Sequence, residues 1–195
     1  MKIAYSHLVS FFEEEPSIEE VSNYLFQLGH ENEINNDILD IEFTPNRGDC
    51  LSLLGLARDL GTFYTISEPL IYYDDNLDPL EIDFTNHSIN DCPNISFLTI
   101  EIDEVPNVYK DYLESYFSIF KINKNNFFTD ISNYIAYEMG QPTHCYDNSL
   151  ISGGIEFTSD IINEDFETLL DKTITLGGKN CFFRSNNEVI NLAGV

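Results

Sequence analysis

Residues 38–60 read ILDIEFTPNRGDCLSLLGLARDL and contain the strongest local structure signals of the chain. Residues 38–43 alternate apolar and acidic side chains over most of their length, which predicts a strand with one buried face. Proline, asparagine and glycine in residues 44–48 end that strand. Leucines then recur at helical spacing after Asp49, which we expect to be the N-cap, and Gly61 ends the helix. The stretch therefore predicts a strand, a tight turn and a helix.

A second pair of elements precedes this stretch. Residues 2–6 are apolar and aromatic enough for a short strand. Ser17 followed by a glutamate three residues later forms a capping box, and apolar residues at helical spacing run from there to Gly29. Residues 31–37 are polar and rich in asparagine, which predicts a loop. Two helices with flanking strands predict a small α+β domain over residues 1–66.

The composition changes after this domain. Residues 67–93 are acidic and rich in turn-forming residues, which favours a solvated linker with an edge strand. Residues 94–195 predict a second, larger α+β domain, so the fold class of the whole chain is α+β. Apolar spacing indicates two helices there, at 109–120 and 127–139, followed by short strands at 155–158, 173–176, 181–184 and 189–193.

The overall composition excludes several classes of protein. The 195 residues include 34 acidic and only 9 basic ones, with a net charge of −25 and 43% hydrophobic residues. Such a chain can fill a core, but by itself we expect weak or no binding to nucleic acid, because phosphate contacts need Lys and Arg. It has no apolar run of membrane-spanning length and no signal-peptide pattern. Four scattered cysteines without a CxxC pair argue against a zinc site and disulfides, and favour the cytoplasm.

Two segments carry side chains that could do chemistry. In the turn after residue 43, Arg47 and Asp49 are close enough in sequence to pair, and a structural role is favoured there. In the second segment, Asn133 lies within a predicted helix despite its poor helix propensity, so we expect its amide to have a specific partner. His144 follows the Gly-Gln-Pro that ends this helix, and could be a general base, a water-positioning group or a structural histidine. Cys145 as a nucleophile beside His144 has little support, because adjacent residues rarely form a catalytic dyad. His144 and Asp147 as metal ligands have little support, because no third ligand is nearby in the sequence.

Both segments resemble signatures of one family, the bacterial phenylalanine–tRNA ligase β subunits. Residues 38–60 resemble one signature, and residues 130–147 resemble another at the entry to the B3/B4 editing domain. Residues 192–195 look like the beginning of a third. The chain also departs from the family. Residues 31–37 stand where most relatives have an OB-type tRNA-binding domain, so that insertion is expected to be absent. The usual threonine is Ser132, and the usual His-Ala-Phe-Asp is His-Cys-Tyr-Asp.

The resemblance implies an α2β2 ligase in which the α subunit charges tRNA(Phe), using ATP and magnesium. None of these cofactors is expected in this chain, and no metal. The β part would instead hydrolyse tyrosine misattached to tRNA(Phe). By position in the motifs, His144 and Asn133 are the expected catalytic residues. Ser132 and Gly194 are the expected substrate-binding residues.

Two other interpretations stay open. The chain could be a non-catalytic structural module of the ligase, or a free-standing deacylase acting in trans on mischarged tRNA. The net charge of −25 argues against the free-standing deacylase, because such an enzyme would need its own affinity for the negatively charged tRNA. The family's editing domain also extends beyond the match and includes a glutamate that recognises the tyrosine hydroxyl. We therefore expect an incomplete editing domain that is inactive alone, whether the chain is a fragment or a natural short form.

Overall fold

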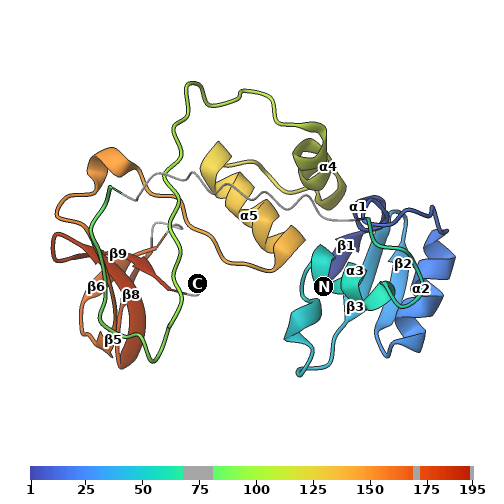
Figure 1. Cartoon of the computed structure of the whole chain (residues 1–195), viewed down its shortest axis with the longest axis horizontal. Helices are drawn as coiled ribbons and strands as arrows, with labels where there is room; N and C mark the ends of the chain where they lie inside the picture. Colours follow the sequence, from blue (N-terminus) through green and yellow to red (C-terminus); the bar gives the residue numbers. More distant parts are fainter. Residues whose placement is uncertain (68–80, 169–171, 194–195) are drawn as a thin grey trace. The chain divides into compact units, whose positions relative to one another are not determined.

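The computed structural model of the protein describes residues 1–67, 81–168 and 172–193 (Figure 1). These residues form two compact units. The first unit holds residues 1–67 and 104–145, and the second holds the other described residues. Helices and strands occur together in this chain, so the fold class is α+β, as the sequence predicts.

A three-stranded antiparallel sheet lies in the first unit. Its strands are β1 (Lys2–Ala4), β2 (Glu31–Asn35) and β3 (Ile38–Glu42), in the order β1-β3-β2. β2 and β3 form a hairpin whose turn contains Asn36 at φ 55°, a left-handed conformation that asparagine tolerates better than most residues. The predicted loop over residues 31–37 is therefore wrong. β2 is an edge strand exposed over most of its length, so it carries no apolar alternation.

Of the first two helices in this unit, the second begins where the sequence predicts, and the first takes the place of part of a predicted strand. The expected strand at residues 2–6 stops at Ala4, and α1 (Tyr5–Val9) follows directly. α2 (Ile18–Gln27) begins after Ser17, whose Oγ accepts a hydrogen bond from the Glu20 amide at 3.2 Å. This is the N-cap that the capping-box pattern predicts.

The third helix corrects one expectation. α3 (Leu53–Leu60) is capped by Ser52, whose Oγ accepts a hydrogen bond from the Gly55 amide at 3.0 Å. Asp49 instead lies in the short 3₁₀ helix η1 (Gly48–Cys50), and its carboxylate faces arginine side chains. The prediction that Asp49 caps the helix is therefore wrong, because the arginines compete for its oxygens.

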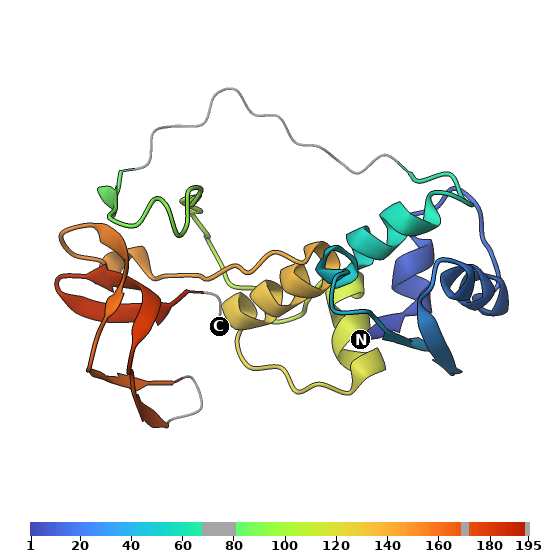
Figure 2. The same cartoon turned by 90° about the horizontal axis from the view of Figure 1, so that it is seen from below.

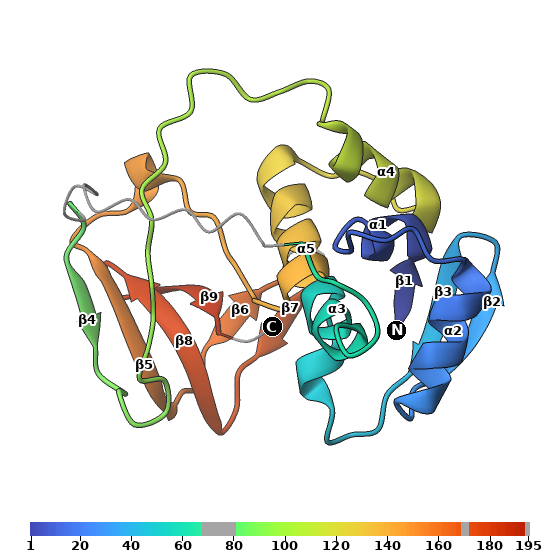
Figure 3. The ribbon, with the colours of Figure 1, turned by 45° about the vertical axis from the view of Figure 1, so that its right-hand side comes forward.

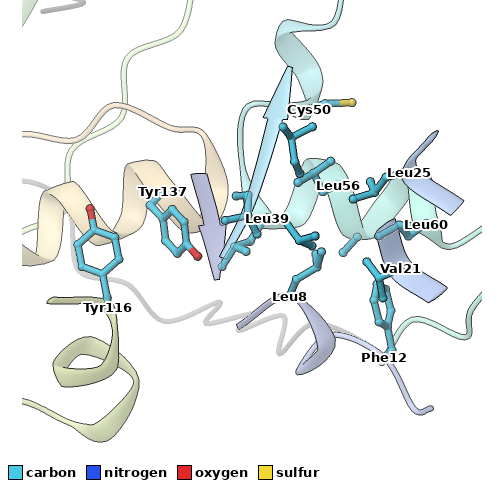
Figure 4. Close-up of a cluster of buried hydrophobic side chains, with 14 of the residues drawn as sticks. Leu8, Phe12, Val21, Leu25, Leu39, Cys50, Leu56, Leu60, Tyr116 and Tyr137 are labelled. Atoms are coloured by element: carbon cyan, nitrogen blue, oxygen red, sulfur yellow. The ribbon is translucent and has the colours of Figure 1, made fainter. Parts of the chain in front are cut away.

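Two further helices complete the first unit. α4 (Asp111–Phe120) and α5 (Phe127–Met139) match the predicted ranges closely. Their aromatic side chains join the core of the first sheet, and Figure 4 shows Tyr116 and Tyr137 in the same cluster as Leu8 and Leu39. The predicted domain over residues 94–195 includes these helices, whereas the structure packs them with the first unit. Helical spacing identifies the buried face of a helix but does not identify what covers it.

The second unit is built on a mixed sheet. Its elements are β4 (Phe84–Asn86), the 3₁₀ helix η2 (Asn148–Leu150), β5 (Ile155–Ile161), β6 (Asp165–Glu167), β7 (Thr173–Thr175), β8 (Lys179–Ser185) and β9 (Glu188–Leu192). The strands of the mixed sheet lie in the order β4-β5-β8-β9, with β4 parallel to β5 and the other pairs antiparallel (Figure 3). Phe157 and Phe182 are almost completely buried on this sheet. A separate two-stranded ribbon, β6 with β7, follows β5 in the chain (Figure 2).

No helix in the described part of the chain is long and apolar enough to span a membrane.

Candidate functional site

The two motif-bearing segments meet inside the first unit. α5 ends at Gly140, which has φ 71° and therefore a conformation that favours glycine. A Cβ at this position would lie 3.2 Å from Cβ of Ser52, the residue that caps α3. A groove of about 440 Å³ lies at this junction, and its lining residues are Gly48, Asp49, Ser52, Leu54, Gly55, Arg58, Met139, Gly140 and Gln141. The start of α3 and the end of α5 are thus held close to one another.

A network of ion pairs holds the turn before α3. Arg47 donates to both carboxylate oxygens of Asp49, at 3.0 and 3.1 Å, which confirms the predicted pairing. It also donates to Asp59 on α3 at 2.5 Å, and Arg58 pairs with Asp49 as well. Hydrogen bonds from Arg47 hold the pKa of Asp49 well below its usual range. These contacts support the structural role that the sequence favours for this turn.

Arg47 and Asp59 of this network also contact the buried thiol of Cys50. Cys50 is fully buried and His30 is 2% exposed. Their Sγ and Nε2 atoms are 4.0 Å apart, and both lie close to the carboxylate of Asp59. Burial raises the pKa of the Cys50 thiol to about 12, and the neighbouring Asp59 carboxylate adds to this shift. No spacing in the sequence predicts this cluster, because its members are 20 and 9 residues apart and on different elements.

The loop after α5 folds back along that helix. Ser132 Oγ on α5 and Cys145 Sγ on the loop are 3.8 Å apart, although 13 residues separate them. Ser132 is half-buried, while Asn133 and His144 are exposed. The contact brings the residue after His144 beside the helix that carries Ser132 and Asn133.

The side chains of Asn133 and His144 differ from one another in their surroundings. The Asn133 amide makes no hydrogen bond with any residue that the structure describes, so the expected specific partner is not found there. Its position on the exposed face of α5 explains how the helix tolerates it. Partial desolvation lowers the pKa of His144, which favours the neutral imidazole near pH 7. A neutral imidazole can accept a proton from water.

The remaining candidate residues are Asp147 and Gly194, together with any group of metal ligands. Asp147 caps η2 and accepts hydrogen bonds from the amide and hydroxyl of Ser149, which lower its pKa. Among the described residues, the single group of three ligand-type side chains is that of His30, Cys50 and Asp59, and His144 is not part of it. Gly194 lies outside the described residues.

Comparison with known proteins supports the resemblance of the motifs. Residues 105–195 match the B3/4 domain family. Three curated proteins named phenylalanine–tRNA ligase beta subunit are similar to the chain. That of Ehrlichia canis is 33% identical over 164 residues, covering 81% of this chain and 20% of that protein. That of Nitratidesulfovibrio vulgaris is 30% identical over 178 residues, covering 87% and 22%. That of Psychrobacter arcticus is 29% identical over 167 residues, covering 83% and 21%.

A solved structure also aligns with the chain. It is an N-terminal fragment of the phenylalanyl-tRNA synthetase beta-subunit from Pyrococcus horikoshii, with a TM-score of 0.46 and 15% identity, covering 100% of this chain and 61% of that one. The sequence relatives are much longer than the chain, which spans about a fifth of their length. Their similarity extends over most of the chain, which is therefore similar to phenylalanine–tRNA ligase β subunits and matches the B3/4 domain family over residues 105–195.

Proposed function

We propose that this chain is part of a phenylalanine–tRNA ligase β subunit and contributes to the hydrolysis of tyrosine misattached to tRNA(Phe). The observation that carries the proposal is the B3/4 match over residues 105–195, which includes Ser132, Asn133 and His144. The contact between Ser132 and Cys145 brings the His144 loop against the helix that bears the other two. In this proposal, the groups on α5 and its following loop form one side of the substrate site.

The chemistry suits side chains of this kind. A synthetic pocket for phenylalanine rejects an added hydroxyl group incompletely, so a second site that hydrolyses the wrong ester corrects the error. Ester hydrolysis needs a positioned water and support for the developing oxyanion. The lowered pKa of His144 keeps its ring neutral, as a water-positioning group or general base requires. In this proposal Ser132 and Asn133 supply hydrogen-bonding groups for the substrate, and Gly194 would approach the substrate with its backbone.

The proposed assembly supplies what this chain lacks. Nine basic residues against 34 acidic ones leave little surface for phosphate contacts. An α subunit in an α2β2 complex would charge the tRNA with ATP and magnesium, and the remainder of the β subunit would hold the tRNA. The proposed location is the cytoplasm, where protein synthesis supplies the substrate.

The test uses the complete β subunit assembled with its α partner. We expect His144→Ala to slow the hydrolysis of Tyr-tRNA(Phe) by about 10²-fold, the lower end for loss of general acid–base catalysis, with phenylalanine charging unchanged. His87→Ala is the matched control, because His87 is also exposed and pairs with Glu156 in the other unit. Editing at the normal rate in His144→Ala would remove His144 from the mechanism.

A structural role is the second candidate, and the groove between the motifs favours it. A Cβ at Gly140 would lie 3.2 Å from Cβ of Ser52, so the absence of a side chain at Gly140 lets the end of α5 approach the start of α3, and both signatures would then serve to hold α3 against α5. If the assembled ligase retains full editing with Ser132, Asn133 and His144 all replaced by alanine, this role is the correct one. A shift in the electrophoretic mobility of tRNA with this chain alone, at moderate salt, would instead support a free-standing deacylase.

A further inference from the structure

The buried cluster of His30, Cys50 and Asp59 has the composition of a transition-metal site. Imidazole nitrogen, thiolate sulfur and carboxylate oxygen are the three donor types that zinc takes in proteins. The donors come from three places: His30 follows α2, Cys50 belongs to η1 and Asp59 lies on α3. His30 and Cys50 are buried and Asp59 is 15% exposed, so the donors are held by the core of the first unit.

The spacing of the three donor atoms fits a single ion. His30 Nε2 and Asp59 Oδ2 are 3.2 Å apart, Cys50 Sγ and Asp59 Oδ2 are 3.4 Å apart, and Cys50 Sγ and His30 Nε2 are 4.0 Å apart. Zinc bonds of about 2.0–2.3 Å at tetrahedral angles place the donors about 3.3–3.6 Å from one another. Two of the three edges lie within about 0.1 Å of that range, and the third needs a movement of about 0.4 Å.

A positive group already lies against these donors. Nη2 of Arg47 is 2.7 Å from Cys50 Sγ and 2.5 Å from Asp59 Oδ2. Arg47 also binds both oxygens of Asp49, at 3.0 and 3.1 Å. Nη2 makes one of these two bonds as well as the contacts with the cluster, so the guanidinium leaves the cluster by turning together with the Asp49 carboxylate. Asp49 is 44% exposed, so its side chain has room to turn, and the bidentate pair, the stronger kind of arginine contact, is kept.

We propose that His30, Cys50 and Asp59 form a binding site for a zinc-class divalent cation, for which the Arg47 guanidinium competes. Zn²⁺ binding forms bonds to Nε2, Sγ and a carboxylate oxygen, and the Cys50 thiol proton leaves to solvent. One thiolate and one carboxylate then balance the two charges of the ion. With Arg47 in place, the neutral thiol and the Asp59–Arg47 pair are also balanced. The two states thus differ in whether Zn²⁺ or the Arg47 guanidinium binds the donor atoms. In the zinc-bound state, water would take the fourth coordination position.

The test is a titration of the full chain with Zn²⁺ against a chromophoric chelator, and with Co²⁺ followed by absorption. We expect one ion per chain and a thiolate-to-cobalt charge-transfer band, which carboxylates on the acidic surface cannot produce. Cys50→Ser should abolish the band and His30→Gln should weaken binding. Cys145→Ser is the matched control, because Cys145 is an exposed free thiol in the same unit, and it should leave both readouts unchanged.

Arg47→Met provides the sharper test, since it removes the competing cation and keeps the donors. We expect it to tighten Zn²⁺ binding at least tenfold, while circular dichroism of the metal-free protein reports whether the fold persists. A thiolate band in the native chain supports the site even if a variant fails to fold. Absence of the band in both native chain and folded Arg47→Met, or a band that disappears with Cys145→Ser, would overturn the proposal.

Discussion

Replacing Tyr137 with phenylalanine tests how α5 is attached to the first unit. The Tyr137 hydroxyl accepts a hydrogen bond from the Ala4 amide at 3.1 Å, across 133 residues of sequence. Ala4 is fully buried, and Tyr137 is 8% exposed. Phenylalanine keeps the ring packing but leaves a buried N–H without an acceptor, which costs about 1–3 kcal/mol. We expect the free energy of unfolding to fall by that amount in urea titrations with an unchanged slope.

The matched control for this change is Tyr134→Phe on the same helix. The Tyr134 hydroxyl donates to Glu138 at 3.1 Å, and Tyr134 is 6% exposed, so burial of the two rings is similar. Its loss leaves a carboxylate that water can solvate, and the cost should stay below about 1 kcal/mol. Hydrogen exchange at the Ala4 amide should accelerate in Tyr137→Phe alone. Equal stability of the two variants with unchanged Ala4 exchange would show that α5 does not pack on β1 in this way.

Two further predictions concern the junction of the motifs and a buried histidine. Gly140→Ala should destabilise the protein by about 1–2 kcal/mol, because φ is 71° and its Cβ would crowd Ser52. Gly48→Ala, whose Cβ meets no atom within 4 Å, should be nearly neutral, and equal thermal midpoints for the two would contradict this reasoning. Burial lowers the pKa of His7, and this effect outweighs the opposite effect of the Asp37 carboxylate. As the pH falls, the unfolded chain therefore takes up a proton on His7 before the folded protein does. The free energy of unfolding should then decrease as the pH drops through about 6.5. His7→Gln should flatten this dependence between about pH 7 and pH 5, and an unchanged pH profile would refute the assignment.

Local patterns predict many of the elements. The Ser17 cap, α4, α5 and the strand at β3 all follow from spacing, capping residues and helix-ending glycines within a few residues of each. The polar strand β2 does not, because it is an exposed edge strand with no apolar alternation, and it is held by backbone pairing with β3. The cap of α3 is predicted three residues too early for a similar reason, since the arginines that claim Asp49 are identified only once the turn is folded.

The candidate site divides in the same way. The motifs direct attention to Ser132, Asn133 and His144, and the comparisons support the family in which those motifs occur. The contact between Ser132 and Cys145, the exposure of Asn133 and the lowered pKa of His144 come from the fold. The cluster of His30, Cys50 and Asp59 depends even more on the fold. The absence of a CxxC pair in the sequence argues against a zinc site, and only the fold brings these three donor atoms together.

The sequence by itself determined the α+β class, most helices, the acidic character and the family resemblance. Those properties depend on composition and on residues near one another in the chain. Tertiary structure alone decided that α4 and α5 pack with the first sheet, and that His30, Cys50 and Asp59 come within 4.0 Å of one another. The physical reason is that burial is non-directional: an apolar helix face specifies that it must be covered, whereas the shapes and charges of distant segments select what covers it.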